Sequence, residues 1–181
     1  MRIDVYREKC VILESFPRSG SPVLIRTYPE LARELVKMIS SATREIYIAP
    51  RYYEPAIGSR LLAKFAEGVS IHVLDSNACG VRFEERIRVA LTHDAKNREL
   101  MQKLLDSPGT IVKTEDLPYS FAVVDGKYCG VELTNPNNPD NFSLALKLES
   151  SELAKELIGM FESLAGSSIP KKIQVIENVG Q

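Results

Sequence analysis

The clearest hydrophobic pattern in the chain predicts an amphipathic helix that begins at about residue 28. Thr27 and Glu30 have the spacing of a capping box, in which the Thr side chain accepts a backbone amide and the Glu reaches back, and Pro29 is tolerated in a first helical turn. The apolar residues after it recur at helical spacing: Leu31, Leu35, Met38, Ile39 and Ala42. One side of this helix must therefore face a hydrophobic core.

A strand, a helix and a second strand are predicted next. Residues 45–50 form a short, mostly apolar strand, Pro55 marks a helix start, and Gly68 stands where a helix end takes glycine. The apolar stripe of this helix consists of Ile57, Leu61, Leu62 and Phe65. Residues 69–75 are the second strand. Such a unit builds a parallel sheet covered by helices, and sites in such sheets form beyond the carboxyl ends of the strands.

A hairpin is predicted at Asp125-Gly126. Apolar residues alternate before the turn, in 121–124, and after it, in 129–133. Asp-Gly readily supplies the positive φ angles of a type I′ turn, which matches the twist of two antiparallel strands. The hairpin is thus expected to pair antiparallel strands within the sheet.

The remaining segments complete an α/β prediction. Residues 81–92 fit a helix and a strand equally well, and two Asn-Pro steps exclude helix from the loop at 134–141. Further elements are expected at these positions: a helix at 94–106, strands at 110–114 and 143–148, and a helix from Ser150 or Ser151 that Gly166 closes. The fold class is α/β, with a mixed, largely parallel sheet covered by helices. Residues 28–168 form this domain, after N-terminal strands or a linker at 1–27 and before a tail at 169–181.

Composition narrows the classes of function. The chain has 23 Lys and Arg against 24 Asp and Glu, so its charge as a whole does not favour nucleic acid or an anionic membrane. Residues 1–4 lack the apolar core of a secretory signal and no run is long enough to span a bilayer, so we expect a cytoplasmic protein. The cysteines, Cys10, Cys79 and Cys129, are widely spaced and predict small buried hydrophobes. We expect no metal site and no cofactor.

Several phrases of the sequence resemble one half of a phospholipase D superfamily protein. They are AKFAEGVSIHVLD, SFAVVDGKYCGVEL, NFSLALKL and SSELAKELIGMFESL, within a match that covers roughly residues 28–165. In active members of this superfamily a His-x-Lys-x4-Asp motif precedes the turn, and its histidine attacks phosphorus. With the motif's aspartate on Asp125, its lysine falls on Ser120 and its histidine on Pro118. Proline has no nucleophile and serine no charge, so the resemblance implies a degenerate, non-catalytic site.

Degenerate domains of this kind resemble the effector portion of archaeal TrmB-like transcription regulators. The resemblance implies a module that senses a small molecule, a sugar or another metabolite, and that acts as a homodimer. Binding to DNA would occur only through a separate DNA-binding domain, and no membrane is involved. Sequence therefore predicts a cytoplasmic ligand-sensing or protein-interaction module related to transcription regulation.

The predicted ligand site combines the strand ends with the hairpin. Arginine can grip an anion, tyrosines can stack, and Ser, Asp, Glu and Asn side chains can bond hydroxyl groups. Its residues are Arg51, Tyr52, Tyr53, Asp75, Ser120, Asp125, Glu132 and Asn141.

Two other functions stay open at the level of sequence. One is a phosphodiesterase or nuclease of the superfamily with unorthodox catalytic residues, which would be drawn from Ser120, Asp125, Glu132 and His93. The other is a nucleic-acid binder that uses Arg82, Arg86 and Arg88, although acidic residues interrupt that cluster and a solvated face explains it as well.

Overall fold

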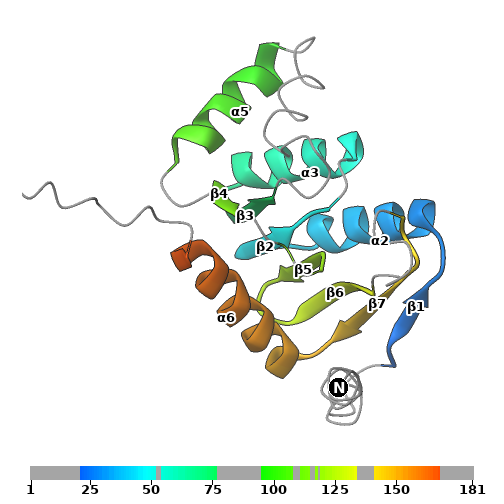
Figure 1. Cartoon of the computed structure of the whole chain (residues 1–181). Helices are drawn as coiled ribbons and strands as arrows, with labels where there is room; N and C mark the ends of the chain where they lie inside the picture. The colour runs from blue at the N-terminus through cyan, green and yellow to red at the C-terminus, as the bar shows by residue number, and fades with distance from the viewer. Residues whose placement is uncertain are drawn as a thin grey trace, which may run out of the picture.

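The computed structural model describes residues 21–51, 54–76, 95–107, 111–114, 117, 119–133 and 141–167. They form a seven-stranded sheet in the order β1-β7-β6-β5-β2-β3-β4, with helices on both faces (Figure 1). The strands are β1 (Val23–Ile25), β2 (Glu45–Ala49), β3 (Ser70–Ser76), β4 (Ile111–Thr114), β5 (Phe121–Val124), β6 (Tyr128–Leu133) and β7 (Leu144–Glu149). The helices are α2 (Tyr28–Ser40), α3 (Pro55–Ala66), α5 (Ala95–Asp106) and α6 (Ser151–Ser167).

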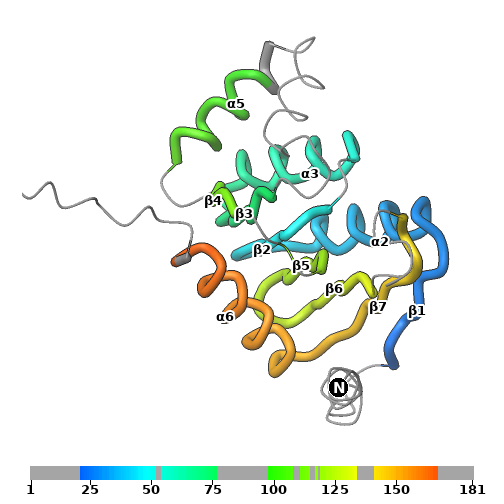
Figure 2. The backbone as a smooth tube through the Cα atoms, in the orientation of Figure 1, coloured from blue at the N-terminus to red at the C-terminus, as the bar shows by residue number. Residues whose placement is uncertain are grey.

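The sheet is mixed, as predicted. Strands β2, β3 and β4 are parallel neighbours, and the remaining neighbours, from β1 to β2 along the sheet, pair antiparallel. Following these pairings across the sheet, β5 and β7 run against the direction of the other strands. The tube in Figure 2 shows how the chain passes from the parallel part through the β5–β6 hairpin to β7 and α6.

Local sequence explains where α2 begins. The Thr27 hydroxyl accepts the backbone N–H of Glu30 at 3.4 Å, and Pro29 lies in the first turn. The Glu30 carboxylate accepts the backbone N–H of Arg26 at 3.2 Å, one residue before the position that a capping box predicts. The apolar stripe then buries Leu31, Met38 and Ile39. The predicted helix and its core-facing side are confirmed.

The two faces of the sheet hold two separate hydrophobic cores. Alternate strand residues, such as Ile48 and Val73, pack under α2, α3 and α5, while their neighbours, such as Leu74 and Val123, pack under α6. Figure 1 shows α2 and α3 on one side of the sheet and α6 on the other. This strict alternation fixes which side chains reach each face at the strand ends.

The hairpin has the predicted turn. Asp125 has φ of 55° and Gly126 has φ of 65°, and the Lys127 N–H donates to the Val124 carbonyl at 3.1 Å. Positive φ at both central residues is what a type I′ turn requires. Gly68 also has a positive φ, 87°, directly after α3. Both sequence signals therefore mark left-handed backbone.

A few predictions differ from the structure or fall beyond it. Helix α6 continues to Ser167, past Gly166, because the glycine keeps a helical backbone and does not close the helix. The predictions for the N-terminal strands before residue 21, for 81–92, for Cys10 and Cys79, and for the tail lie outside the described residues. Within the described part of the chain, every helix is too short or too polar to cross a membrane.

Glu34 joins α2 to the sheet. Its carboxylate binds Lys37 at 2.6 Å and Lys147 of β7 at 2.9 Å. The hydrogen bonds from Lys37 and Lys147 lower the pKa of Glu34 from 4.5 to about 2. A depressed folded-state pKa contributes stability above the unfolded value that is lost as the pH falls through the folded value.

Glu34→Gln is therefore expected to lower the free energy of unfolding by about 1 kcal/mol at pH 7, after allowance for solvent screening of this partly exposed pair. The difference between the two proteins should shrink as the pH falls from 4.5 towards 2. Urea unfolding over this pH range measures it. Glu152→Gln on α6 is the control, since Glu152 is exposed, and an equal loss in both variants would contradict the account.

Candidate functional site

Three strands bring polar groups together at one end of the sheet. Arg51 follows β2, Ser120 precedes β5, and Glu132 lies near the end of β6. The Glu132 N–H donates to the Ser120 carbonyl at 2.9 Å, which continues the β5–β6 pairing. The Ser120 hydroxyl accepts the Arg51 N–H at 2.9 Å. Backbone pairing thus fixes Ser120 between the other two residues.

These residues form the polar end of a cavity between the sheet and α2. The space in the cavity, together with the open solvent at its mouth, amounts to about 510 Å³. Residues of α2 line it from above, Ile57 of α3 lines it from the side, and β2, β5 and β6 form its floor. The full lining is Tyr28, Leu31, Ala32, Leu35, Ile48, Ala49, Pro50, Arg51, Ile57, Ser120, Phe121, Ala122, Gly130, Val131 and Glu132.

The polar end combines an acidic and a basic residue. Glu132 is only 3% exposed, whereas Arg51 is half-buried. Strand alternation places Ser120 on the same face as Ala122, and Glu132 on the same face as Gly130. This end can accept hydrogen bonds through Glu132 and Ser120 and can donate them through the Arg51 guanidinium.

Two small residues lie on the floor of the cavity. Ala122 of β5 and Gly130 of β6 are directly opposite each other on the floor. A Cβ atom at Gly130 would lie 3.6 Å from the Met38 Cε atom and 3.7 Å from a Leu35 Cδ atom, which is ordinary contact. Met38 and Leu35 of α2 therefore already pack over Gly130, and the backbone does not require glycine at this position.

The sequence did not reveal the α2 side of the cavity. Leu31 and Leu35 read as core residues of an amphipathic helix, and nothing in that pattern separates a core position from a cavity wall. The one available signal was Gly130, since glycine inside a strand often marks a close approach to a ligand or to other backbone.

Other predicted site residues lie elsewhere. Asp75 lies near the end of β3, at the same end of the sheet as Arg51. It is completely buried and does not line the cavity. Asn141 is exposed before β7 and also does not line the cavity. Tyr52, Tyr53 and Pro118 lie outside the described residues.

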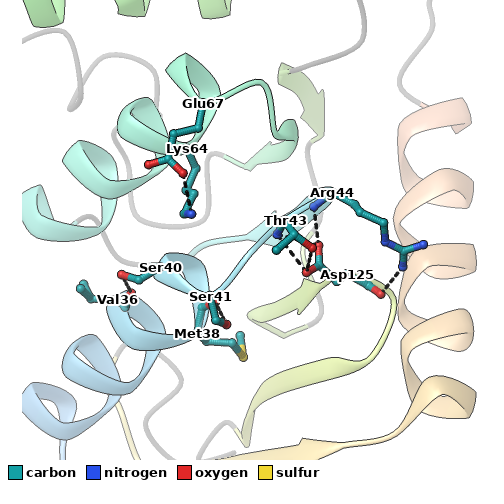
Figure 3. Close-up of polar contacts among 9 residues, drawn as sticks. All are labelled: Val36, Met38, Ser40, Ser41, Thr43, Arg44, Lys64, Glu67 and Asp125. Atoms are coloured by element: carbon teal, nitrogen blue, oxygen red, sulfur yellow. Dashed lines mark hydrogen bonds and ion pairs between the residues drawn. The ribbon is translucent and has the colours of Figure 1, made fainter.

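Asp125 does not share the cavity, which corrects its predicted place beside Ser120. The two residues flank β5 at opposite ends, about 16 Å apart for an extended chain. The Asp125 carboxylate accepts the backbone N–H groups of Thr43, Arg44 and Glu45 at 2.8–3.2 Å and the Thr43 hydroxyl at 2.9 Å. Figure 3 shows this cluster, with the Arg44 guanidinium donating to the Asp125 carbonyl.

This arrangement gives Asp125 a structural role. Burial by itself would raise the pKa of Asp125, but hydrogen bonds from the Glu45, Arg44 and Thr43 amides and the Thr43 hydroxyl outweigh it, so the pKa is lowered from 3.8. The carboxylate ties the turn between α2 and β2 to the hairpin. Asp125 thus serves the fold and leaves the cavity to other residues.

His72 and Cys129 lie on the face of the sheet opposite to the cavity. His72 stacks on Tyr47 on the α6 side of the sheet, with ring centroids 4.4 Å apart. Cys129 is completely buried on that side, and burial raises the pKa of its thiol to about 12, so it is a small hydrophobe, as predicted. His93 lies outside the described residues. Within those residues, no group of three His, Cys, Asp or Glu side chains could hold a metal ion.

Comparison with solved structures places this architecture in a known class. It is similar to Nuc from Salmonella typhimurium, a phospholipase D family member, with a TM-score of 0.56 at 16% identity over 82% of this chain and 96% of that one. It is also similar to NucT from Helicobacter pylori, with a TM-score of 0.56 at 17% identity over 81% of this chain and 96% of that one. The chain therefore has a fold similar to that of these proteins.

The predicted likeness to TrmB-like proteins is also found. TrmBL2, an archaeal chromatin protein whose structure shows a novel mode of DNA binding, aligns with a TM-score of 0.58 at 11% identity. The alignment covers 91% of this chain but spans only 61% of the length of TrmBL2. No protein-family model matches the sequence, and no curated protein matches it either. At these identities the likeness concerns the fold alone.

Proposed function

We propose that the chain is a non-catalytic ligand-sensing module, the effector domain of a transcription regulator or a relative of one, and that it acts as a dimer. The observation that carries this proposal is the cavity under α2. Its polar end joins Arg51, Ser120 and Glu132, which are groups suited to binding. No histidine or cysteine is among its described lining residues.

The serine at position 120 argues against phosphodiester chemistry. In the family motif a lysine stands where this chain has Ser120, and the Ser120 hydroxyl here accepts the Arg51 amide. The carboxylate of Glu132, 3% exposed, lies in the neighbouring strand at the same level. The described lining of the cavity therefore has no lysine at the position where the family motif has one.

The proposed dimer has an apolar surface available to it. Val23 and Leu24 of the edge strand β1 are 47% and 41% exposed, and Leu133 at the end of β6 is 42% exposed. Exposed apolar edge strands favour pairing with a second chain. Light scattering is expected to give twice the 20.2 kDa mass of the chain, and Leu24→Glu should shift the protein towards monomer. A monomer at micromolar concentration would contradict this part of the proposal.

A ligand screen tests the sensing function. Thermal melting of the full chain would be followed with panels of sugars, amino acids and nucleotides. A ligand of the cavity should raise Tm in the parent and in Glu152→Gln, and the rise should be much smaller in Glu132→Gln. An equal rise in all three proteins would place binding elsewhere and contradict the proposal.

The alternative is a phosphodiesterase with unorthodox residues. It is favoured by the fold shared with Nuc and NucT along nearly their whole length. This reading requires Ser120, Glu132, Asp125 or His93 to act in catalysis. The Asp125 carboxylate binds backbone amides at the far end of β5, so fewer groups are left that could act in catalysis.

A further inference from the structure

We propose that two copies of the chain pair through strand β1, antiparallel about a two-fold axis at Leu24, so that their sheets join into one of fourteen strands, seven from each copy. The inference rests on the proposed dimer and adds the strand and the register that form it. It follows from three features of β1: its place at the edge of the sheet, its composition, and the position of Leu24 across from β7.

The two edge strands of the sheet, β1 and β4, differ in charge. Natural edge strands are kept from pairing with another chain by charged side chains, lysine above all. Strand β4 carries Lys113, which is exposed. Strand β1 consists of Val23, Leu24 and Ile25, of which the first two are 47% and 41% exposed. Within the described residues β1 pairs with β7 alone, so β1 is the edge that suits a second strand.

An antiparallel pairing centred on Leu24 matches β1 with itself. Leu24 then lies opposite the partner's Leu24, and Val23 lies opposite the partner's Ile25, because a contact about a two-fold axis is reciprocal. Arg26 lies opposite the partner's Pro22, so the two Arg26 residues are roughly 14 Å apart along the strands. A parallel pairing in register would place the two arginines side by side, and like charges directly opposite each other are destabilising. The charges flanking β1 therefore favour the antiparallel register.

The same register continues an apolar row across both sheets. Leu24 pairs with Leu146 of β7, which pairs with Val131 of β6, and the latter two pack in the core on the α6 side. Residues directly opposite each other in a sheet share a face, so the row continues through Leu24 into the partner's Leu24. Burial of the two leucines against each other is favourable in proportion to the apolar area removed from water.

Opposite charges at position 24 test the register. Leu24→Glu alone and Leu24→Lys alone each place like charges opposite each other at the axis, so each should weaken the dimer about tenfold or more. An equimolar mixture of the two variants should restore the dimer, because Glu then faces Lys. Sedimentation velocity of the full chain measures the dissociation constants. The same substitutions at Leu133 are the control, since Leu133 is 42% exposed but lies two strands inside the edge, and they should change the constant little.

Cysteine cross-linking gives an independent readout. In a Cys10→Ser, Cys79→Ser background, in which the remaining Cys129 is completely buried, Leu24→Cys should form a disulfide-linked dimer on oxidation with copper phenanthroline. The two Cα atoms at position 24 would be about 4.5–5.5 Å apart, within the range of a disulfide. Val23→Cys is the matched control and should stay unlinked, because its two Cα atoms would be about 8 Å apart.

The outcomes separate this interface from the proposed function. If the parent is a dimer but the mixture is not restored, or if Leu24→Cys stays unlinked, this pairing is wrong while the proposed dimer stands. A monomeric parent overturns both. A monomer in which the Leu24→Cys thiol resists a maleimide would mean that residues 1–20 of the same chain cover the edge, and it overturns the pairing as well.

Discussion

Phe161→Ala is expected to lower the free energy of unfolding by about 3–4 kcal/mol. Phe161 is 4% exposed and is the aromatic residue through which α6 holds the sheet. Its ring lies edge-on to Tyr47, with centroids 5.3 Å apart, and edge-on to His72 at 6.4 Å. Deleting the ring leaves a cavity beside two side chains that already stack on each other, so little collapse can compensate.

Urea unfolding followed by circular dichroism measures this loss. Glu162→Ala is the matched control on the same helix, because Glu162 is exposed, and it should change stability by no more than about 0.5 kcal/mol. Phe161→Leu should fall between the two. A loss below about 1 kcal/mol for Phe161→Ala would mean that α6 contributes little to the folded state, and the two-core description would be wrong.

Asp125→Ala is expected to lower the free energy of unfolding by about 2–3 kcal/mol. It removes the acceptor for the amides of Thr43, Arg44 and Glu45 and places alanine at φ of 55°, a conformation it adopts with strain. Asp125→Asn should lose about half as much, since asparagine keeps one acceptor oxygen and tolerates this φ. The same urea experiment ranks the three proteins.

The pH dependence of this loss follows from the lowered pKa of Asp125. Its folded-state pKa lies below the unfolded value of 3.8, so the contribution is complete above about pH 5 and declines as the pH falls through the folded value. The difference between the parent and Asp125→Asn should therefore shrink in acid. Ligand affinity at pH 7 should be unchanged by Asp125→Asn, and a tenfold loss of affinity would return Asp125 to the site.

The elements that local sequence patterns specify could be predicted well. Thr27 marked the start of α2, and Asp125-Gly126 marked a turn in which both residues have positive φ. The alternation in β7 also predicted that Leu144, Leu146 and Leu148 share one face of the strand. Leu146 and Leu148 pack in the core on the α6 side of the sheet. Capping, turn chemistry and period-two burial act over a few residues, and so they can be read from the sequence.

The composition of the site could be predicted only in part. The predicted site included Arg51, Ser120 and Glu132, which all line the cavity. They lie at one end of the sheet, because Arg51 follows β2, Ser120 precedes β5 and Glu132 is near the end of β6. It also added Asp125, since a separation of five residues looks local in the sequence although Ser120 and Asp125 lie about 16 Å apart along a strand. The cavity residues on α2 could not be predicted. The apolar stripe of an amphipathic helix does not show which of its residues pack tightly on the sheet and which line a cavity.

Turnover of a simple phosphodiester tests the central claim most directly. The full chain would be incubated with bis(4-nitrophenyl) phosphate, with and without Mg²⁺, beside Glu132→Gln and Asp125→Asn. If the cavity is a binding site without a nucleophile, release of 4-nitrophenol should equal the buffer rate in all three proteins. Release above that rate by the parent, abolished in Glu132→Gln and retained in Asp125→Asn, would contradict the account and make this cavity a phosphodiesterase site.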